Sequence, residues 1–196
     1  MTKIKSIAVF CASSEGNSDV YVENAYKLGE TLAKEGYKLV YGGASVGCMG
    51  AVARGAVEHG GIVTGVLPHF LAKREIAQHN LHELIMVDSM HERKLKMNEL
   101  SDACISLPGG FGTMEEFFEM ITWGQLGLHQ KPSALLNVNG FYDHLIAQLK
   151  FMNQEQLLKD KYLKMVLIDK DIKRLLRSIE NYQPPEIEKW LVEEKS

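Results

Sequence analysis

The residues best suited to chemistry lie in the stretch PGGFGTMEE, residues 108–116, between an apolar run and a helical pattern. Gly109, Gly110 and Gly112 let backbone amides approach a ligand closely, although each glycine loses more backbone freedom on folding than any other residue. The amino terminus of the following helix, near Thr113, adds unpaired N–H groups and roughly half a positive charge. The stretch therefore predicts a loop that binds a phosphate group.

Thr113 and Glu116 also have a purely structural interpretation. They form the pattern T-x-x-E of a capping box, in which the threonine oxygen accepts from the Glu116 amide and the glutamate reaches back. Capping alone would explain these two residues. It does not explain the glycines before them, because the start of a helix needs no such backbone freedom.

A second segment, SMHERKLKMNELSD at residues 89–102, supplies positive charge. Met90, Arg93, Lys94 and Met97 fall at helical spacing on one face, so that a guanidinium and an ammonium lie between two thioethers. A charged run of this kind is usually a solvated helix face. Its position favours a functional role, because the helix directly precedes the strand that leads into PGGFGT.

A second glycine loop, GGASVGCMG at residues 42–50, follows an earlier apolar run. It contains GASVG, the G-x-S-x-G pattern of a nucleophile elbow, which makes Ser45 an alternative nucleophile for a serine hydrolase. The chain is short for that hydrolase fold, and the elbow would follow only the second strand. A tight loop that packs strand against helix is a further interpretation, and we include Gly43 among the candidate substrate contacts. Neither glycine loop has the dinucleotide fingerprint or the GK[ST] ending of a P-loop.

Composition limits the partners. The 22 basic and 25 acidic residues give a net charge of -3, so there is no broad field for nucleic acid or an anionic membrane, and an anion must be bound locally. The 196 residues, 45% of them hydrophobic, suit a single domain over residues 1–196, with residues 182–196 as a peripheral tail. We expect neither nucleic acid nor a membrane as a partner.

Cysteine and histidine usage argues against disulfides and metals. The three cysteines are odd in number and widely spaced, which suits buried free thiols in a reducing compartment. The pairs in HELIM and HERKL lack the second histidine of a zinc-protease helix. Because no apolar run is long enough for a signal peptide or a membrane span, we expect a cytoplasmic protein without metal or cofactor.

Short apolar runs alternate with helical patterns along most of the chain. Such runs predict a parallel sheet covered on both faces, in a Rossmann-like, doubly wound α/β fold of about seven strands. The runs are 4–11, 37–43, 61–67, 83–88, 103–108, 133–138 and 164–169, and the helical patterns are 18–36, 50–60, 90–101, 113–128, 141–152 and 170–181. In such a sheet, ligands bind at the carboxyl ends of the strands where strand order reverses.

The stretch FFEMITWGQLGL, residues 117–128, carries apolar side chains around nearly its whole circumference. A helix of this kind must be buried on several sides. The sheet covers one side, and a second copy of the chain is a suitable cover for another. We therefore expect a homodimer.

Taken together, MHERKLKM, PGGFGTMEE and TWGQLGLHQKP, with GGASVGCMG upstream, resemble the Lonely Guy family of cytokinin-activating phosphoribohydrolases. The resemblance extends from the first strand to about residue 150. It implies a Rossmann-like homodimer that hydrolyses the N-glycosidic bond of adenine-type nucleoside 5'-monophosphates, such as AMP and cytokinin riboside 5'-monophosphates. The products are the free base and ribose 5-phosphate. The label lysine decarboxylase, which such proteins have also carried, does not fit, because no residue stands out as a Schiff-base lysine with an acidic partner.

The resemblance also implies roles for individual residues. It places the catalytic arginine at Arg93 and the catalytic glutamate at Glu116. It places substrate contacts at Lys94, Glu75, Thr122 and the loop Gly110 to Thr113. The sequence around Glu75, KREIAQHN, and the part of the chain after about residue 150 depart from the plant proteins.

Chemistry supports this assignment. A carboxylate beside the anomeric carbon stabilises an oxocarbenium-like transition state or orients water, and a helix amino terminus favours the ionised form of Glu116. A guanidinium stays charged and cannot readily act as a general acid, so we assign Arg93 to orienting the nucleotide and Glu116 and leave the proton donor open. A non-catalytic nucleotide-binding module that uses the same loops is the alternative, since fold alone does not determine function.

Overall fold

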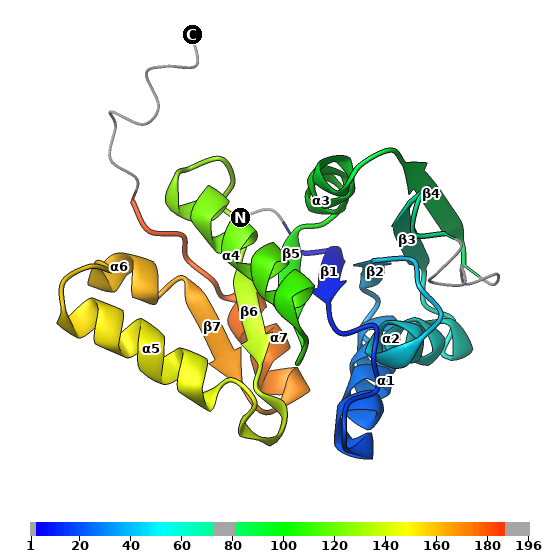
Figure 1. Ribbon diagram of the computed structural model, residues 1–196, viewed down its shortest axis with the longest axis horizontal. Helices are drawn as coiled ribbons and strands as arrows, with labels where there is room; N and C mark the ends of the chain where they lie inside the picture. The colour runs from blue at the N-terminus through cyan, green and yellow to red at the C-terminus, as the bar shows by residue number, and fades with distance from the viewer. Residues whose placement is uncertain (1–2, 73–80, 187–196) are drawn as a thin grey trace, which may run out of the picture.

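The computed structural model describes residues 3–72 and 81–186, and this part of the chain forms a seven-stranded sheet with helices on both faces (Figure 1). The strand order is β4-β3-β2-β1-β5-β6-β7, and all neighbouring strands are parallel. The strands are β1 (Ser6–Phe10), β2 (Lys38–Tyr41), β3 (Val63–Pro68), β4 (Glu83–Val87), β5 (Ala103–Ser106), β6 (Ser133–Leu136) and β7 (Val166–Asp169). Each lies within or overlaps a predicted run, so the predicted fold class is confirmed.

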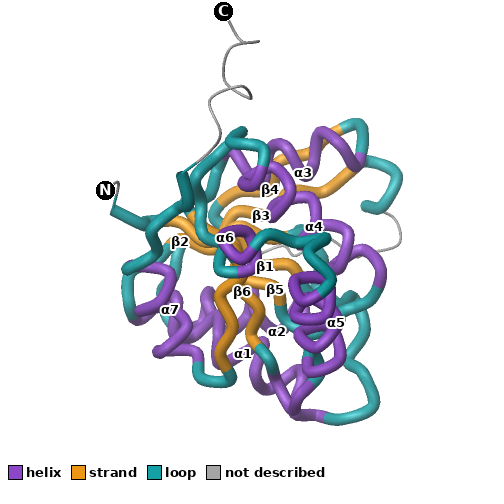
Figure 2. Tube along the Cα trace, turned by 90° about the vertical axis from the view of Figure 1, so that its left-hand side faces the viewer, coloured by secondary structure: helices purple, strands orange, loops and turns teal. Residues whose placement is uncertain are grey.

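Helices join most of the strands and cover the sheet on both sides. They are α1 (Asp19–Lys34), α2 (Gly47–Glu58), α3 (Met90–Glu99), α4 (Phe111–Gln125), α5 (Asp143–Gln154), α6 (Asp160–Leu163) and α7 (Ile172–Glu180), with a 3₁₀ turn η1 at Val138–Gly140. Buried side chains of α1, α2 and α7 pack on one face, and those of α3 and α4 pack on the other together with α5. Figure 2 shows the strands between these two layers. The sequence pattern missed α6 and η1, because each is too short to show a helical period.

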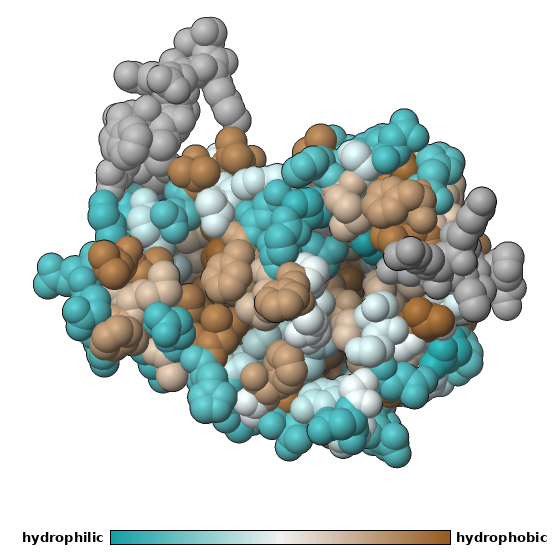
Figure 3. Space-filling model, viewed as in Figure 1, coloured by the Kyte–Doolittle hydropathy of each residue, from teal (hydrophilic) through white to brown (hydrophobic). Residues whose placement is uncertain are grey.

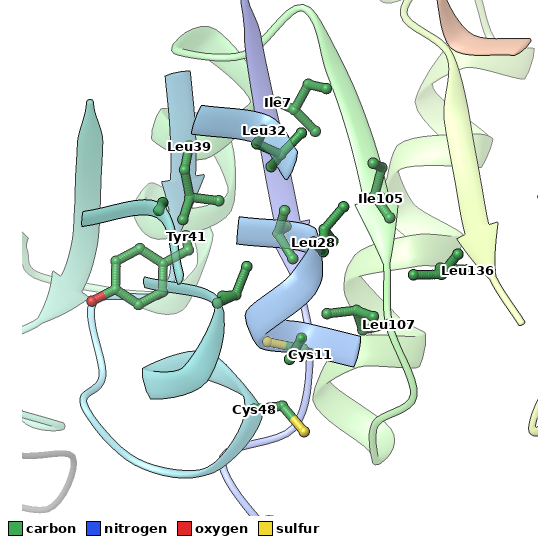
Figure 4. Close-up of a cluster of buried hydrophobic side chains, with 14 of the residues drawn as sticks. Ile7, Cys11, Leu28, Leu32, Leu39, Tyr41, Cys48, Ile105, Leu107 and Leu136 are labelled. Atoms are coloured by element: carbon green, nitrogen blue, oxygen red, sulfur yellow. The ribbon is translucent and has the colours of Figure 1, made fainter. Parts of the chain in front are cut away.

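The larger apolar core lies on the face that α1, α2 and α7 cover. In Figure 4, Leu28 and Leu32 of α1 lie over Ile7, Leu39 and Ile105 of the three central strands. Alternate residues of the same strands point to the opposite face, where a smaller core includes methionines of both α3 and α4. Burial on both faces explains why the strands read as nearly continuous apolar runs.

The strand order reverses between β1 and β5. From β1 the chain builds outward through β2, β3 and β4 on one side, and from β5 through β6 and β7 on the other. The segments that follow β1 and β5 therefore leave the sheet beside each other at its carboxyl edge. One of them is the loop that starts at Cys11, and the other contains Pro108 and the glycines of PGGFGTMEE. A doubly wound fold binds its ligands at this position.

Composition also led to expectations about the cysteines, membrane-spanning helices and metal ions. Cys11, Cys48 and Cys104 are buried and free, as predicted. Within residues 3–72 and 81–186, no helix is long and apolar enough to cross a membrane. The same residues contain no group of three or more His, Cys, Asp or Glu side chains that could hold a metal ion.

Candidate active site

A cavity of about 330 Å³ opens at the carboxyl edge of the sheet, where the strand order reverses. Its volume falls in the range of about 300–1,000 Å³ that is typical of ligand sites. The predicted site residues in its lining are Met90, Arg93, Gly110, Gly112, Thr113 and Glu116. Two segments more than a dozen residues apart in the sequence, the start of α3 and the start of α4, thus meet in one cavity.

The start of α4 forms one wall of this cavity. The helix begins at Phe111, with Gly110 as its N-cap and no side-chain capping hydrogen bond. The capping box predicted from Thr113 and Glu116 is therefore wrong, because Thr113 is the third helical residue rather than the cap. Glycine is itself a favoured N-cap, and with Gly110 in this position the helix starts three residues earlier than with a Thr113 cap. The first-turn amides, which no helix can satisfy internally, lie in residues that line the cavity.

The glycines of the loop have two different roles. A Cβ atom at Gly110 or Gly112 would meet no other atom within 4 Å, so both positions border open space. At Gly109 the Cβ would lie 2.1 Å from Thr113 Oγ1, so this glycine makes room for the buried threonine. Gly109 faces a smaller neighbouring cavity of about 190 Å³ rather than the main one. A ligand in the main cavity can approach the backbone at Gly110 and Gly112 without a clash.

Arg93 of α3 also lines the cavity, and backbone carbonyl groups hold its guanidinium. Only 5% of the residue is exposed. Nε donates to the carbonyl of Val66 at 3.1 Å and Nη2 to the carbonyl of Gly42 at 2.9 Å, while Nη1 lies 3.9 Å from Met90 Sδ. Two of the five guanidinium N–H groups are thereby bound to the residue that follows β2 and to a residue within β3. The arginine has a defined orientation before any ligand arrives.

Glu116 brings a negative charge to the same cavity. The residue is 8% exposed and lies on the face of α4 that also buries Thr113 and Phe117. The charges of Glu116 and Arg93 both affect the pKa of the Cys11 thiol. Burial raises this pKa, Cys48 and Glu116 raise it further, and Arg93 lowers it. Cys11 is therefore a neutral thiol at pH 7, and it lies in the lining beside the two charged residues.

Besides Gly109, three described residues that were predicted to contact substrate do not line this cavity: Lys94, Thr122 and Gly43. Lys94 is buried against Glu115 and Glu119 of α4, and Thr122 is exposed further along that helix. Gly43 has a φ of 80° and packs against the side chains of Leu67 and Leu84, so its role is in the turn after β2. Glu75 lies outside the described residues.

The loop GGASVGCMG packs closely against neighbouring backbone and does not hold Ser45 in the strained turn of a nucleophile elbow. Among the described non-glycine residues, positive φ angles occur at Asn139 and Gln156, so Ser45 lacks the strained left-handed backbone expected there. Gly47 has a φ of 56°, and a Cβ there would lie 2.4 Å from the carbonyl carbon and oxygen of Ser13. The packing interpretation of this loop therefore accounts for Gly47, and Gly42 holds Arg93.

Sequence reasoning missed part of the lining. The missed residues are Cys11, Ala12, Ser13, Ser14 and Met49. The segment after β1 is anchored to α2, since the amides of Cys48 and Met49 donate to the carbonyls of Ser14 and Ala12 at 3.3 and 3.2 Å. Its signal in the sequence is weak: a short run of small residues at the end of the first strand, which gains meaning only once β1 is known to lie at the switch point.

Comparison with known proteins places the chain in a family. Residues 49–179 match the family model described as "possible lysine decarboxylase". The chain is 46% identical over 176 residues to the probable cytokinin riboside 5'-monophosphate phosphoribohydrolase LOGL1 of Oryza sativa subsp. japonica, covering 90% of this chain and 79% of that protein. It is 44% identical over 176 residues to the cytokinin riboside 5'-monophosphate phosphoribohydrolase of Rhodococcoides fascians, covering 89% of each.

Solved structures agree with the fold. The molybdenum cofactor binding protein of Rippkaea orientalis superposes with a TM-score of 0.68 at 26% identity, over 91% of this chain and 99% of that one. The Moco carrier protein of Chlamydomonas reinhardtii gives a TM-score of 0.65 at 22% identity, over 90% and 99% of the two chains. The sequence relatives are far more similar than these structures, and they carry the assignment. The chain belongs to the family of cytokinin riboside 5'-monophosphate phosphoribohydrolases, the Lonely Guy family that its motifs resemble.

Proposed function

We propose that this protein hydrolyses the N-glycosidic bond of adenine-type nucleoside 5'-monophosphates, including AMP and cytokinin riboside 5'-monophosphates. The main support for this proposal is that Arg93, Glu116 and the first turn of α4 line one cavity. The family relatives, named for this activity, support it. The products are the free base and ribose 5-phosphate.

The 5'-phosphate binds at the start of α4. The backbone around Gly110 and Gly112 borders open space, and the helix terminus supplies N–H groups and a favourable dipole. Because these groups provide the positive potential, we expect no metal or cofactor to be required. Phosphate binding places the ribose deeper in the cavity, towards Glu116.

Glu116 acts where positive charge develops. As the bond between C1' and the base nitrogen breaks, its electron pair leaves with the base and the sugar becomes oxocarbenium-like. The Glu116 carboxylate stabilises that cation and orients the water that attacks C1'. The hydroxyl of the water stays on the sugar, and a proton is taken up by the base. Arg93, held by the Gly42 and Val66 carbonyls, orients the nucleotide and Glu116.

The functional unit is proposed to be a cytoplasmic homodimer that binds neither nucleic acid nor membrane. Phe118 of α4 is 39% exposed, Leu126 at the C-cap of the helix is 42% exposed, and Leu128 beyond it is half exposed. Figure 3 shows brown, apolar patches on the face that carries α4, including the upper left where that helix ends in Figure 1. A second copy would remove these side chains from water, which is the principal driving force of association.

A non-catalytic nucleotide-binding module is the second candidate, because the molybdenum cofactor binding protein of Rippkaea orientalis shares the fold. The placement of a carboxylate in the cavity favours catalysis, since binding an anionic nucleotide alone gains nothing from Glu116. Incubating the purified protein with AMP and measuring adenine and ribose 5-phosphate by chromatography separates the two. Release of both products supports the hydrolase, and stoichiometric binding of intact AMP supports the module.

A further inference from the structure

Lys94 follows Arg93 in the sequence but is absent from the lining of the described cavity. Its side chain is 5% exposed, and its ammonium donates hydrogen bonds to Glu115 and, at 3.0 Å, to Glu119. Burial by itself lowers the pKa of Lys94, but the hydrogen bonds and charges of both carboxylates outweigh it, so the pKa is raised. Lys94 is thus a buried, charged group held by two carboxylates at neutral pH.

These ion pairs connect two helices that rest on different strands. α3 packs on β3 and β4, whereas α4 packs on β1, β5 and β6. Glu115 and Glu119 lie one turn apart on α4, so both carboxylates reach the same ammonium of α3. Lys94, Glu115 and Glu119 therefore form a direct bridge between the helices, which we call the α3–α4 clamp.

The clamp lies beside the proposed catalytic residues. Arg93 immediately precedes Lys94 on α3, and Glu116 immediately follows Glu115 on α4. A shift of one helix relative to the other changes the separation of Arg93 and Glu116 inside the cavity. A misplacement of about 1 Å costs on the order of 10²-fold in rate when reacting groups must be aligned.

We infer that Lys94 is a positioning residue, whose ion pairs with Glu115 and Glu119 hold α3 and α4 at the separation that Arg93 and Glu116 require. The inference rests on the proposed phosphoribohydrolase activity. It replaces the substrate contact that the family resemblance implies for Lys94. To reach a nucleotide, the ammonium would have to leave both carboxylates. The Glu115 side chain is 54% exposed, but Glu119 is 21% exposed, and separating the buried ammonium from Glu119 is unfavourable.

A mutant cycle tests the clamp. Lys94→Met and the double variant Glu115→Ala/Glu119→Ala should each lower kcat for AMP by at least about 10-fold, with KM changed less than about 3-fold, because only alignment is lost. Combining all three substitutions should cost no more than about 2-fold beyond Lys94→Met, since residues of one network are not additive. Lys94→Arg, which keeps the charge, should restore kcat to within about 3-fold. Lys96→Met and Glu99→Ala, an exposed pair on α3, are the matched controls.

The outcomes separate the two roles of Lys94. If it contacts substrate, Lys94→Met raises KM for AMP, and the carboxylate variant, which keeps the ammonium, retains wild-type kcat. Independent, multiplying losses also overturn the clamp. Glu119 is 21% exposed, and one of its oxygens is buried without a partner among the described residues. Because Lys94→Met removes its cation, we expect this variant to have a lower thermal transition. The carboxylate variant then carries the test by itself. Failure of the wild-type protein to release adenine would refute the proposed function instead.

Discussion

Nη2 of Arg93 lies 2.9 Å from the carbonyl oxygen of Gly42, and a Cβ added at position 42 would lie 2.0 Å from the same nitrogen. Residue 42 can therefore hold the guanidinium only if it has no side chain. This requirement explains why residue 42 of GGASVGCMG is a glycine although its φ is not positive. It also links a turn after β2 to a residue at the cavity wall, 51 positions later in the chain.

Gly42→Ala should displace the Arg93 guanidinium without removing it. We expect kcat for AMP to fall by about 10-fold or more, because the orienting group moves by roughly the 1 Å that alignment cannot tolerate. Steady-state kinetics measure this effect. Gly36→Ala is the control: its φ of 81° makes the change strained, but no atom lies within 4 Å, so stability should drop while kcat stays at the wild-type value. Equal kcat in Gly42→Ala and wild type would contradict the role of Gly42.

Glu116→Gln keeps the shape of the side chain and removes its charge. Loss of this one electrostatic stabiliser should lower kcat by roughly 10²-fold or more while the thermal transition is retained. Calorimetry and AMP turnover on the same preparation check both parts. The same change at exposed Glu99 serves as control. A Glu116→Gln variant with full activity would remove the carboxylate from the mechanism.

Arg93→Ala should differ from Glu116→Gln in its effect on stability. It also lowers kcat by roughly 10²-fold or more. In addition it leaves the buried carbonyls of Gly42 and Val66 without their donor, which costs about 1–3 kcal/mol for each group. Chemical denaturation measures that loss. An unchanged free energy of unfolding would show that the two carbonyl bonds are not formed in solution.

Gly110→Val tests the approach of the phosphate to the backbone. The added atoms meet no protein atom at the Cβ position, and the φ of -90° suits any residue, so the fold should be preserved. Within the cavity the side chain occupies the space that the phosphate needs. We expect the preference for AMP over adenosine to be largely lost, and Gly110→Ala to give an intermediate value. A preference that survives in Gly110→Val would place the phosphate elsewhere.

The dimer is open to a direct test. Light scattering at micromolar concentration should give twice the mass of one chain, 22.0 kDa. Leu126→Asp, on the exposed apolar side of α4, should weaken association, because a buried unpaired charge is costly. Phe151→Asp on α5, 55% exposed, is the matched control and should leave the mass unchanged. A monomeric wild-type protein would leave the apolar residues of α4 without this explanation.

Much of the fold follows from local sequence pattern. The five inner strands are predictable because both faces of the sheet are buried there, so that each is a compact apolar run bounded by turn residues. The edge strands β4 and β7 are less buried but are also mainly apolar in sequence. The start of α4 could not be predicted, because Gly110 and Thr113 are both acceptable N-caps and only packing selects the earlier one. Short elements such as α6 have no period to detect.

The cavity lining could be predicted where it coincides with a local motif, as at Gly110, Gly112 and Glu116. Gly42 could not be chosen over Gly43 from the sequence, since the contact that distinguishes it comes from Arg93 on a distant helix. Lys94 was predicted to contact the substrate but lies outside the cavity lining. Its neighbour Arg93 enters the cavity, and a rotation of about 100° along the helix turns Lys94 towards α4 instead.

The specificity constants for AMP and adenosine, measured from release of free adenine, show whether the 5'-phosphate binds at the start of α4 and promotes hydrolysis. Binding of the 5'-phosphate at the start of α4 is remote from the bond that breaks, and its energy can hold the ribose in reactive geometry. We predict that kcat/KM for AMP exceeds that for adenosine by on the order of 10³-fold, which corresponds to about 4 kcal/mol. Equal constants for the two substrates, or no adenine from AMP, would contradict the account.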